Sequence, residues 1–158
     1  MVPQKRCELI VALDYAEARD ALVAVDQLAS LPVIYKVGSE LFINGGPELV
    51  RELVRRNLRV FLDLKFHDIP NTVAKAVSQV ARLHVEYLTV HLAGGEAMLK
   101  SAVAELASLT GPRPKILGVS VLTSFDELSW GTMLAALGAA AVPPEASVAG
   151  LVELGVRS

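Results

Sequence analysis

Five short apolar runs recur along the chain at nearly even intervals, and this spacing limits the fold more than any other feature. The runs are rich in Val, Ile and Leu and cover residues 9–13, 33–37, 60–64, 87–91 and 116–122. Their starts lie 24, 27, 27 and 29 residues apart, which suits a strand followed by a returning helix. Because uninterrupted apolar runs are typical of strands covered on both faces, the pattern predicts a buried parallel sheet.

Segments with helical spacing fill the intervals between the apolar runs. We predict helices over residues 18–29, 47–56, 72–83, 96–106 and about 144–153. Pro47 suits a first helical turn, and Asn71 suits an N-cap. Residues 131–144 are rich in small residues and proline, so we expect a loop there. Gly155 and Val156 resemble the start of a sixth strand.

Polar residues at the ends of the apolar runs separate two possible α/β folds. Asp14, Lys36, Asp63 with Lys65, His91 and Thr123 each lie at or just after the end of a run. In a (β/α)8 barrel the chemistry gathers at the C-terminal ends of several strands. A doubly wound nucleotide-binding sheet would instead carry G-x-G-x-x-G after its first strand, and neither that motif nor a Walker A sequence is present. The sequence predicts a (β/α)8 TIM barrel.

The length implies that the barrel is incomplete. A whole barrel takes roughly 250 residues, whereas residues 1–158 supply only five to six βα units. We expect one barrel domain over residues 1–158 that lacks its C-terminal part, whether the truncation is natural or belongs only to this sequence.

Composition excludes several classes of function. The net charge is -2 and no basic stripe occurs, so no nucleic-acid partner is expected. One cysteine, Cys7, permits neither an internal disulfide nor a zinc-binding spacing, and this suits a cytoplasmic protein. Lys5 and Arg6 precede the run 9–13, which is too short for a signal or membrane segment. No membrane association is expected.

Four charged residues at the ends of adjoining runs form the candidate catalytic group. Alternation along a strand would place Asp63 and Lys65 on one face, with Lys36 on the neighbouring strand and Asp68 just beyond. Opposite neighbours would keep each group ionised, so a lysine could deliver a proton beside a carboxylate that repels a substrate anion. A structural ion-pair network is the alternative, but burying four charges costs stability that apolar residues would not cost. The set therefore favours catalysis.

The segment from Asp63 to Thr72, Asp-x-Lys-x-x-Asp-Ile-Pro-Asn-Thr, resembles the signature of the orotidine 5'-phosphate decarboxylase family. Further matches follow in the family's order over about the N-terminal two thirds of its barrel. They are residues 11–14, residues 36–38, His91 with Gly94 and Gly95, and residues 119–124.

The resemblance implies a carbon–carbon lyase that converts orotidine 5'-phosphate to uridine 5'-phosphate (UMP) in pyrimidine biosynthesis, with no metal and no cofactor. Lys65 would protonate a C6 carbanion, and Asp63 would face the departing carboxylate. Lys36 would hydrogen-bond the ribose and fix Asp63. Asp14 would bind a ribose hydroxyl, and Thr123 would read the pyrimidine edge.

The family also implies a homodimer with shared active sites. Asp68 and Thr72 would reach the neighbouring subunit's site. The family's phosphate-binding loops, arginine and lid would lie beyond residue 158. His91 would either line the ligand site or be a structural histidine, and the sequence leaves both open.

Two alternatives remain. An Mg2+-dependent sugar-phosphate decarboxylase or lyase of the same superfamily shares the Asp-x-Lys-x-x-Asp core, but Ile69-Pro70-Asn71-Thr72 argues against it, because that branch generally has glycine there. A non-catalytic barrel fragment that serves as a binding or dimerisation module is the other.

Overall fold

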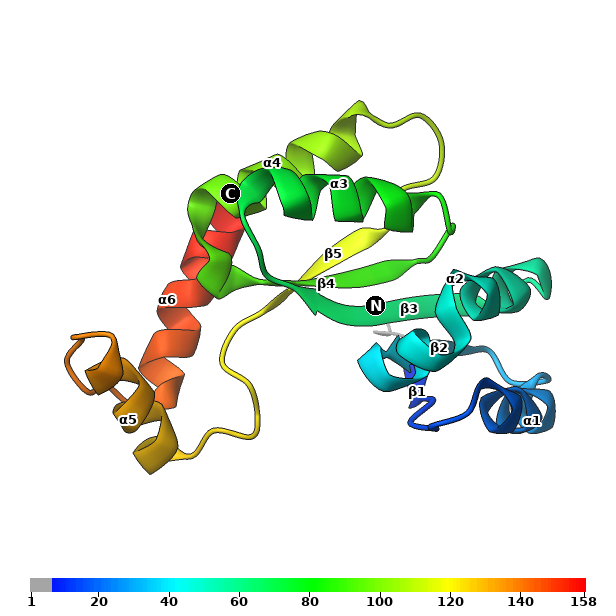
Figure 1. Cartoon of the computed structure of the whole chain (residues 1–158), viewed down its shortest axis with the longest axis horizontal. Coiled ribbons are helices and arrows are strands. Elements are labelled where there is room, and N and C mark those ends of the chain that lie inside the picture. The colour runs from blue at the N-terminus through cyan, green and yellow to red at the C-terminus, as the bar shows by residue number, and fades with distance from the viewer. Residues whose placement is uncertain (1–6) are drawn as a thin grey trace, which may run out of the picture. The chain divides into compact units, whose positions relative to one another are not determined.

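The computed structural model describes residues 7–158, in which strands and helices alternate (Figure 1). Residues 1–6, which include Lys5 and Arg6, lie outside the described part. The elements are β1 (Leu9–Ala12), α1 (Ala18–Leu28), β2 (Val33–Gly38), α2 (Ser39–Arg55), β3 (Arg59–Phe66), α3 (Pro70–Ala81), β4 (Tyr87–His91), the 3₁₀ turn η1 (Leu92–Gly94), α4 (Gly95–Ser108), β5 (Lys115–Val119), α5 (Glu127–Ala136) and α6 (Pro144–Arg157).

The five strands form one sheet in their order along the chain, β1-β2-β3-β4-β5. The β1–β2 pair is parallel, with Ala12 opposite Lys36, and so is the β2–β3 pair, with Gly38 opposite Asp63. Sequential order is that of barrel strands, whereas a doubly wound sheet reverses its order at a switch point. The predicted α/β class with barrel-type strand order is confirmed.

All five predicted strands are present, but the prediction that they are buried is wrong for β1 and β5. Leu9 and Ile10 of β1 are 61% and 43% exposed, and Leu117 of β5 is 37% exposed. These strands are the two edges of the described sheet, so each has a strand neighbour on one side only. Strand β2, which has a neighbour on each side, is the most buried: Val33, Ile34, Tyr35 and Val37 belong to the core.

Of two predicted helix starts, one needs an addition and the other is wrong. Helix α2 begins at Ser39, but a kink where Gly46 adopts a φ of 58° divides it, and its second half begins at Pro47 as predicted. Glycine tolerates that angle, and Pro47 then opens the second half because a first helical turn needs no proline N–H. Helix α3 begins at Pro70, so Asn71 lies inside its first turn and is not its N-cap.

The predictions for the last segments were wrong in part. Helix α5 covers residues 127–136, so its last six residues, 131–136, are helical where a loop was expected. Gly155 and Val156 belong to α6, not to a sixth strand. Tertiary packing explains Gly155, since a Cβ there would lie 2.7 Å from Cδ2 of Leu92. The glycine therefore serves the close approach of α6 to η1.

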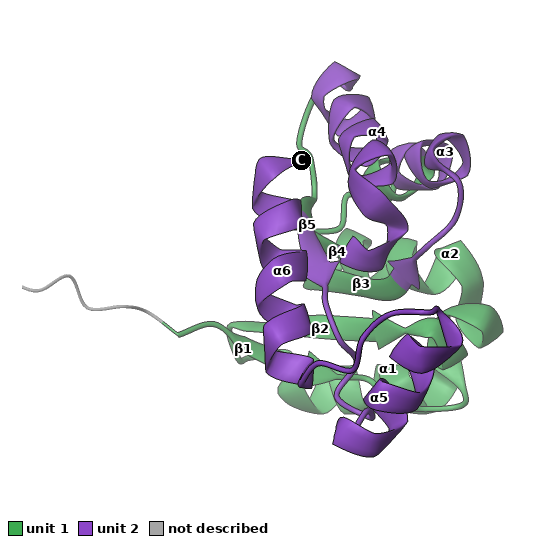
Figure 2. Cartoon of the chain, turned by 90° about the vertical axis from the view of Figure 1, so that its left-hand side faces the viewer, with its two compact units in different colours: residues 1–64, 79–88, 110–115 green, residues 65–78, 89–109, 116–158 purple. Residues whose placement is uncertain are grey.

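The chain divides into two compact units, shown in Figure 2. Unit 1 comprises residues 1–64, 79–88 and 110–115. Within it, α1 contacts α2, and β2 contacts β1 and α2. The Asn44 side chain ties the start of α1 to α2, because its Oδ1 accepts from the Ala18 N–H at 3.0 Å and its Nδ2 donates to Glu17 at 3.1 Å. This fixes the connection that follows β1.

Unit 2 comprises residues 65–78, 89–109 and 116–158. Within it, α4, η1 and α6 contact one another. Trp130 of α5 is buried, packs edge-on against Phe125 with ring centroids 5.2 Å apart, and donates its Nε1–H to Ser147 of α6 at 3.0 Å. The indole thus holds α5 to α6. Over residues 7–158, no helix combines the length and the apolar character needed to cross a membrane.

Candidate active site

Unit 1 brings Asp14, Lys36 and Asp63 together. The Nζ of Lys36 lies 3.4 Å from Oδ1 of Asp14 and 3.8 Å from Oδ2 of Asp63. The Leu13 N–H donates to the Lys36 carbonyl at 2.9 Å, so the backbone beyond β1 is held against β2 where Asp14 projects. The register sets Asp63 opposite Gly38, near the end of β2. The ends of three successive strands therefore supply one charged group.

The three side chains differ in their access to solvent. Asp63 is 12% exposed, Lys36 is 24% exposed and Asp14 is 74% exposed. A carboxylate that is largely removed from water needs a nearby cation, and such a pair is screened by salt less than a surface pair. The ammonium of Lys36 meets that need for Asp63, while Asp14 remains accessible to a ligand.

Lys65 has an unusual backbone conformation. Its φ is 50°, in the left-handed region that few non-glycine residues adopt. Its N–H donates to the Oγ1 of Thr89 at 2.8 Å. Strict alternation of side chains assumes an extended backbone, from which the φ of Lys65 departs.

Asp68 and Thr72 lie at the start of α3 in unit 2. The Oδ1 of Asp68 accepts from the Ile69 N–H at 2.6 Å, and the Ile69 carbonyl accepts from the Thr72 N–H at 3.0 Å. Asp68, Ile69 and Thr72 are all exposed. Residues 67–70 also line an open hollow with Ala93 and Gly94. This segment presents polar side chains on the surface of its unit.

The remaining candidates, Thr123 and His91, also belong to unit 2. Thr123 is exposed in the connection between β5 and α5. His91 ends β4, and its ring centroid lies 5.3 Å from that of His67 with the planes tilted by 33°. The sequence analysis missed this histidine pair, although His67 directly follows β3 and His91 ends β4, the next strand along the chain.

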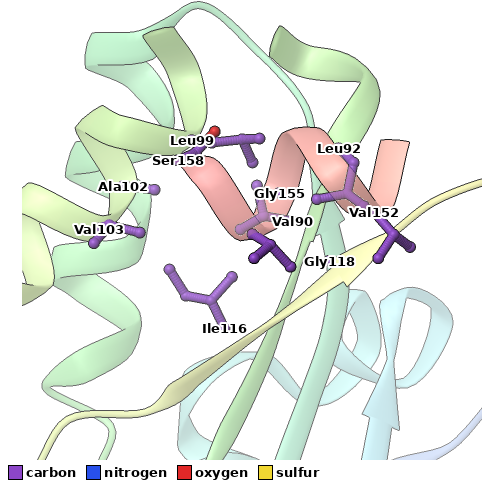
Figure 3. A pocket seen from close by; sticks show the side chains of 11 residues that line it. Val90, Leu92, Leu99, Ala102, Val103, Ile116, Gly118, Val152, Gly155 and Ser158 are labelled. Atoms are coloured by element: carbon purple, nitrogen blue, oxygen red, sulfur yellow. The ribbon is translucent and has the colours of Figure 1, made fainter. Parts of the chain in front are cut away.

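An apolar pocket of about 280 Å³ occurs in unit 2 (Figure 3). Side chains from β4, η1, α4, β5 and α6 line it, namely those of Val90, Leu92, Leu99, Ala102, Val103, Ile116, Val152, Val156 and Ser158, beside Gly118 and Gly155. The lining offers no charged side chain to an anionic ligand. The pocket is thus a poor match for a nucleotide, which needs convergent polar groups.

A second charged group, which the sequence analysis missed, lies at the other end of the strands in unit 1. Arg59, at the start of β3, donates from Nε and Nη2 to the two carboxylate oxygens of Glu86, each at 2.6 Å, and also pairs with Glu8. The Tyr87 hydroxyl donates to Glu8 at 3.1 Å. Arg59 holds the pKa values of Glu86 and Glu8 below their ordinary range. Groups at this end of barrel strands serve stability.

Metal ligands do not cluster in the part of the chain that the structure covers. Among residues 7–158, no three His, Cys, Asp or Glu side chains come together in a group that could hold a metal ion.

Comparison with known proteins identifies the family. Residues 8–153 match the model of the "Orotidine 5'-phosphate decarboxylase / HUMPS family". The orotidine 5'-phosphate decarboxylase of Sodalis glossinidius is 50% identical over 119 residues, which are 75% of this chain and 47% of that protein. The enzyme of the same name from Alkalilimnicola ehrlichii is 48% identical over 146 residues, or 92% of this chain and 60% of that protein.

A solved structure agrees with both sequence matches. The crystal structure of orotidine 5'-phosphate decarboxylase from Lactobacillus acidophilus superimposes with a TM-score of 0.86 and 34% identity, over 97% of this chain and 68% of that one. The chain spans about half the length of the first curated relatives that it matches. With a family model covering residues 8–153 and the charged strand ends in place, the chain belongs to the orotidine 5'-phosphate decarboxylase / HUMPS family.

Proposed function

We propose that this protein removes CO2 from orotidine 5'-phosphate to give UMP, in pyrimidine biosynthesis, without a metal or another cofactor. The family match supports the proposal, and so do relatives named orotidine 5'-phosphate decarboxylase, which share about 50% sequence identity with this chain. The observation that carries it is the group of Asp14, Lys36 and Asp63 at the ends of three successive strands, with Asp63 largely buried beside an ammonium.

The proposed chemistry needs a cation at the reacting carbon. The bond between C6 and the carboxylate breaks, its electron pair stays on C6, and CO2 leaves. The ammonium of Lys65 then donates a proton to C6. Before that transfer, the positive charge of Lys65 stabilises the carbanion electrostatically. A fixed lysine would do so without reorganising water.

The other residues position and bind the substrate in this proposal. Asp63 faces the departing carboxylate and fixes the lysines, and the 3.8 Å distance to Lys36 suits that task. Lys36 also hydrogen-bonds the ribose, and Asp14 binds a ribose hydroxyl, which suits its 74% exposure. Thr123, exposed after β5, reads the pyrimidine edge.

We further propose a cytoplasmic homodimer in which Asp68 and Thr72 complete the partner's active site. Their exposure at the start of α3 leaves them accessible to a second subunit. The phosphate group of the substrate requires contacts that the resemblance assigns to later strands, and binding of such a remote group lowers the barrier at the reacting centre.

The test is a spectrophotometric assay of orotidine 5'-phosphate loss by the protein, with and without EDTA. The proposal predicts turnover that EDTA leaves unchanged. A parallel reaction offers a hexulose phosphate with Mg2+. Turnover of the sugar phosphate alone would establish the Mg2+-dependent alternative, and turnover of neither would favour a binding or dimerisation module. Analytical ultracentrifugation tests the dimer, and a monomer at assay concentrations would refute the shared site.

A further inference from the structure

We propose that Thr89 is a positioning residue that holds the backbone of Lys65 in its left-handed conformation. This inference rests on the proposed function of Lys65 as the proton donor. Thr89 does not touch the reacting atoms in this account. It acts by fixing the residue that does.

The backbone of Lys65 needs an external constraint. A φ of 50° is disfavoured for a residue with a Cβ, and such conformations persist where the surrounding structure determines them. Lysine has no short polar side chain of the kind that lets asparagine or aspartate bond locally in this region. The cause must therefore lie outside residue 65.

The hydroxyl of Thr89 supplies a suitable constraint. In a regular parallel pair, a strand N–H donates to a backbone carbonyl of its neighbour. The N–H of Lys65 instead donates to Oγ1 of Thr89, at 2.8 Å, from a part-buried position. Thr89 is only 5% exposed and lies on β4, and its branched side chain has few rotamers in a strand. The acceptor is therefore itself well fixed.

The hydrogen bond bears on the direction of the lysine side chain. At a left-handed residue the Cβ leaves the alternating pattern of the strand, so the course of the Lys65 side chain depends on that φ value. If the N–H of Lys65 donated to a backbone carbonyl of the neighbouring strand, as in a regular parallel pair, the lysine side chain would point in another direction. Loss of the Thr89 hydroxyl should thus misdirect the ammonium while leaving substrate binding by other residues intact.

The experiment compares Thr89→Val, which keeps the shape and removes the hydroxyl, with Thr89→Ser, which keeps the hydroxyl. Ser78→Ala is the control, because it removes another largely buried hydroxyl (8% exposed) from unit 2. Two kinds of measurement are made on the wild type and each variant: the amide hydrogen exchange rate of Lys65, by NMR, and steady-state kcat and KM for orotidine 5'-phosphate. Thermal unfolding shows that each variant folds.

We expect a protected Lys65 amide in the wild type and faster exchange in Thr89→Val. We also expect kcat to fall on the order of 10- to 100-fold with KM within about twofold, since small misplacements of a catalytic group have effects of this size. Thr89→Ser should restore both quantities, and Ser78→Ala should change neither.

Rapid exchange of Lys65 in the wild type would overturn the proposal without any variant. So would an unchanged kcat in Thr89→Val. An inactive wild type would refute the proposed function, while the exchange rates of Lys65 in the wild type and in Thr89→Val would still decide whether Thr89 fixes its backbone.

Discussion

Replacing Tyr35 with phenylalanine should stabilise the protein. Tyr35 of β2 is fully buried (0% exposed), and its hydroxyl has no hydrogen-bond partner among residues 7–158. A buried hydroxyl without a partner costs about 1–3 kcal/mol. Deleting the oxygen also forfeits a few van der Waals contacts, worth about 0.5 kcal/mol together. The net gain for Tyr35→Phe is therefore about 1 kcal/mol.

The assay is urea denaturation followed by far-ultraviolet circular dichroism. The urea midpoint should rise while the slope of the unfolding free energy against urea concentration stays the same, because the same surface is exposed on unfolding. In thermal unfolding, a gain of about 1 kcal/mol corresponds to a rise in Tm of about 2–4 °C for a protein of this size. A variant less stable than the wild type would refute the reasoning, since it would reveal a partner for the hydroxyl.

The same substitution should change the alkaline limit of stability. Burial raises the pKa of Tyr35, because it disfavours the phenolate. The stability linked to this group is complete below the unfolded pKa of about 10 and is lost as the pH rises through the folded value. The wild type should lose stability above about pH 10, and Tyr35→Phe should lack that contribution. Parallel pH profiles for the two proteins would contradict this prediction.

Three further predictions concern stability. Arg59→Met should destabilise unit 1 by about 1 kcal/mol, because it unpairs Glu86 at a partly exposed site, and chemical denaturation measures this. Because Arg59 lowers the pKa of Glu86, the stability that this pair contributes is present above about pH 4.3 and is lost as the pH falls through the folded pKa of Glu86. Arg59→Met should therefore lose less stability than the wild type over that pH range. Equal losses in the two proteins would contradict the assignment. Leu92→Ala should lower the free energy of unfolding by about 2–3 kcal/mol, because it removes a largely buried side chain and enlarges the apolar pocket. Trp130 fluorescence follows the unfolding. A loss under about 0.5 kcal/mol would show that α6 does not depend on its contact with Leu92.

The regular features of the fold followed from local pattern. Apolar runs at even spacing located all five strands, and helical spacing of apolar residues located the helices between them. Both patterns can be recognised from a few neighbouring residues, because they follow from the geometry of a single strand or helix. Gly155 illustrates the limit of this approach. A glycine next to valine resembles a strand start in isolation, yet this segment is helical. The glycine there leaves space for Leu92, far away in sequence, which a Cβ would fill.

In the candidate site, too, local sequence predicted some features, while others depend on residues far apart in the chain. Charged residue types at strand ends identified Asp14, Lys36 and Asp63, since parallel strands deliver their ends to one edge. The left-handed backbone of Lys65 could not be predicted, because it accompanies a hydrogen bond to a threonine 24 residues away. Thr89 gave no signal within its apolar run, where a threonine is an ordinary strand residue.

The most direct test of the central claim is turnover of orotidine 5'-phosphate by Lys65→Ala and Lys75→Ala, measured in EDTA. Lys75 is an exposed lysine on α3 to which the account assigns no role, so its substitution removes the same charge from unit 2. The account predicts that kcat collapses by at least about 1000-fold in Lys65→Ala, because it loses both the proton donor and the charge that stabilises the carbanion, while Lys75→Ala matches the wild type. Retained turnover in Lys65→Ala would contradict the account.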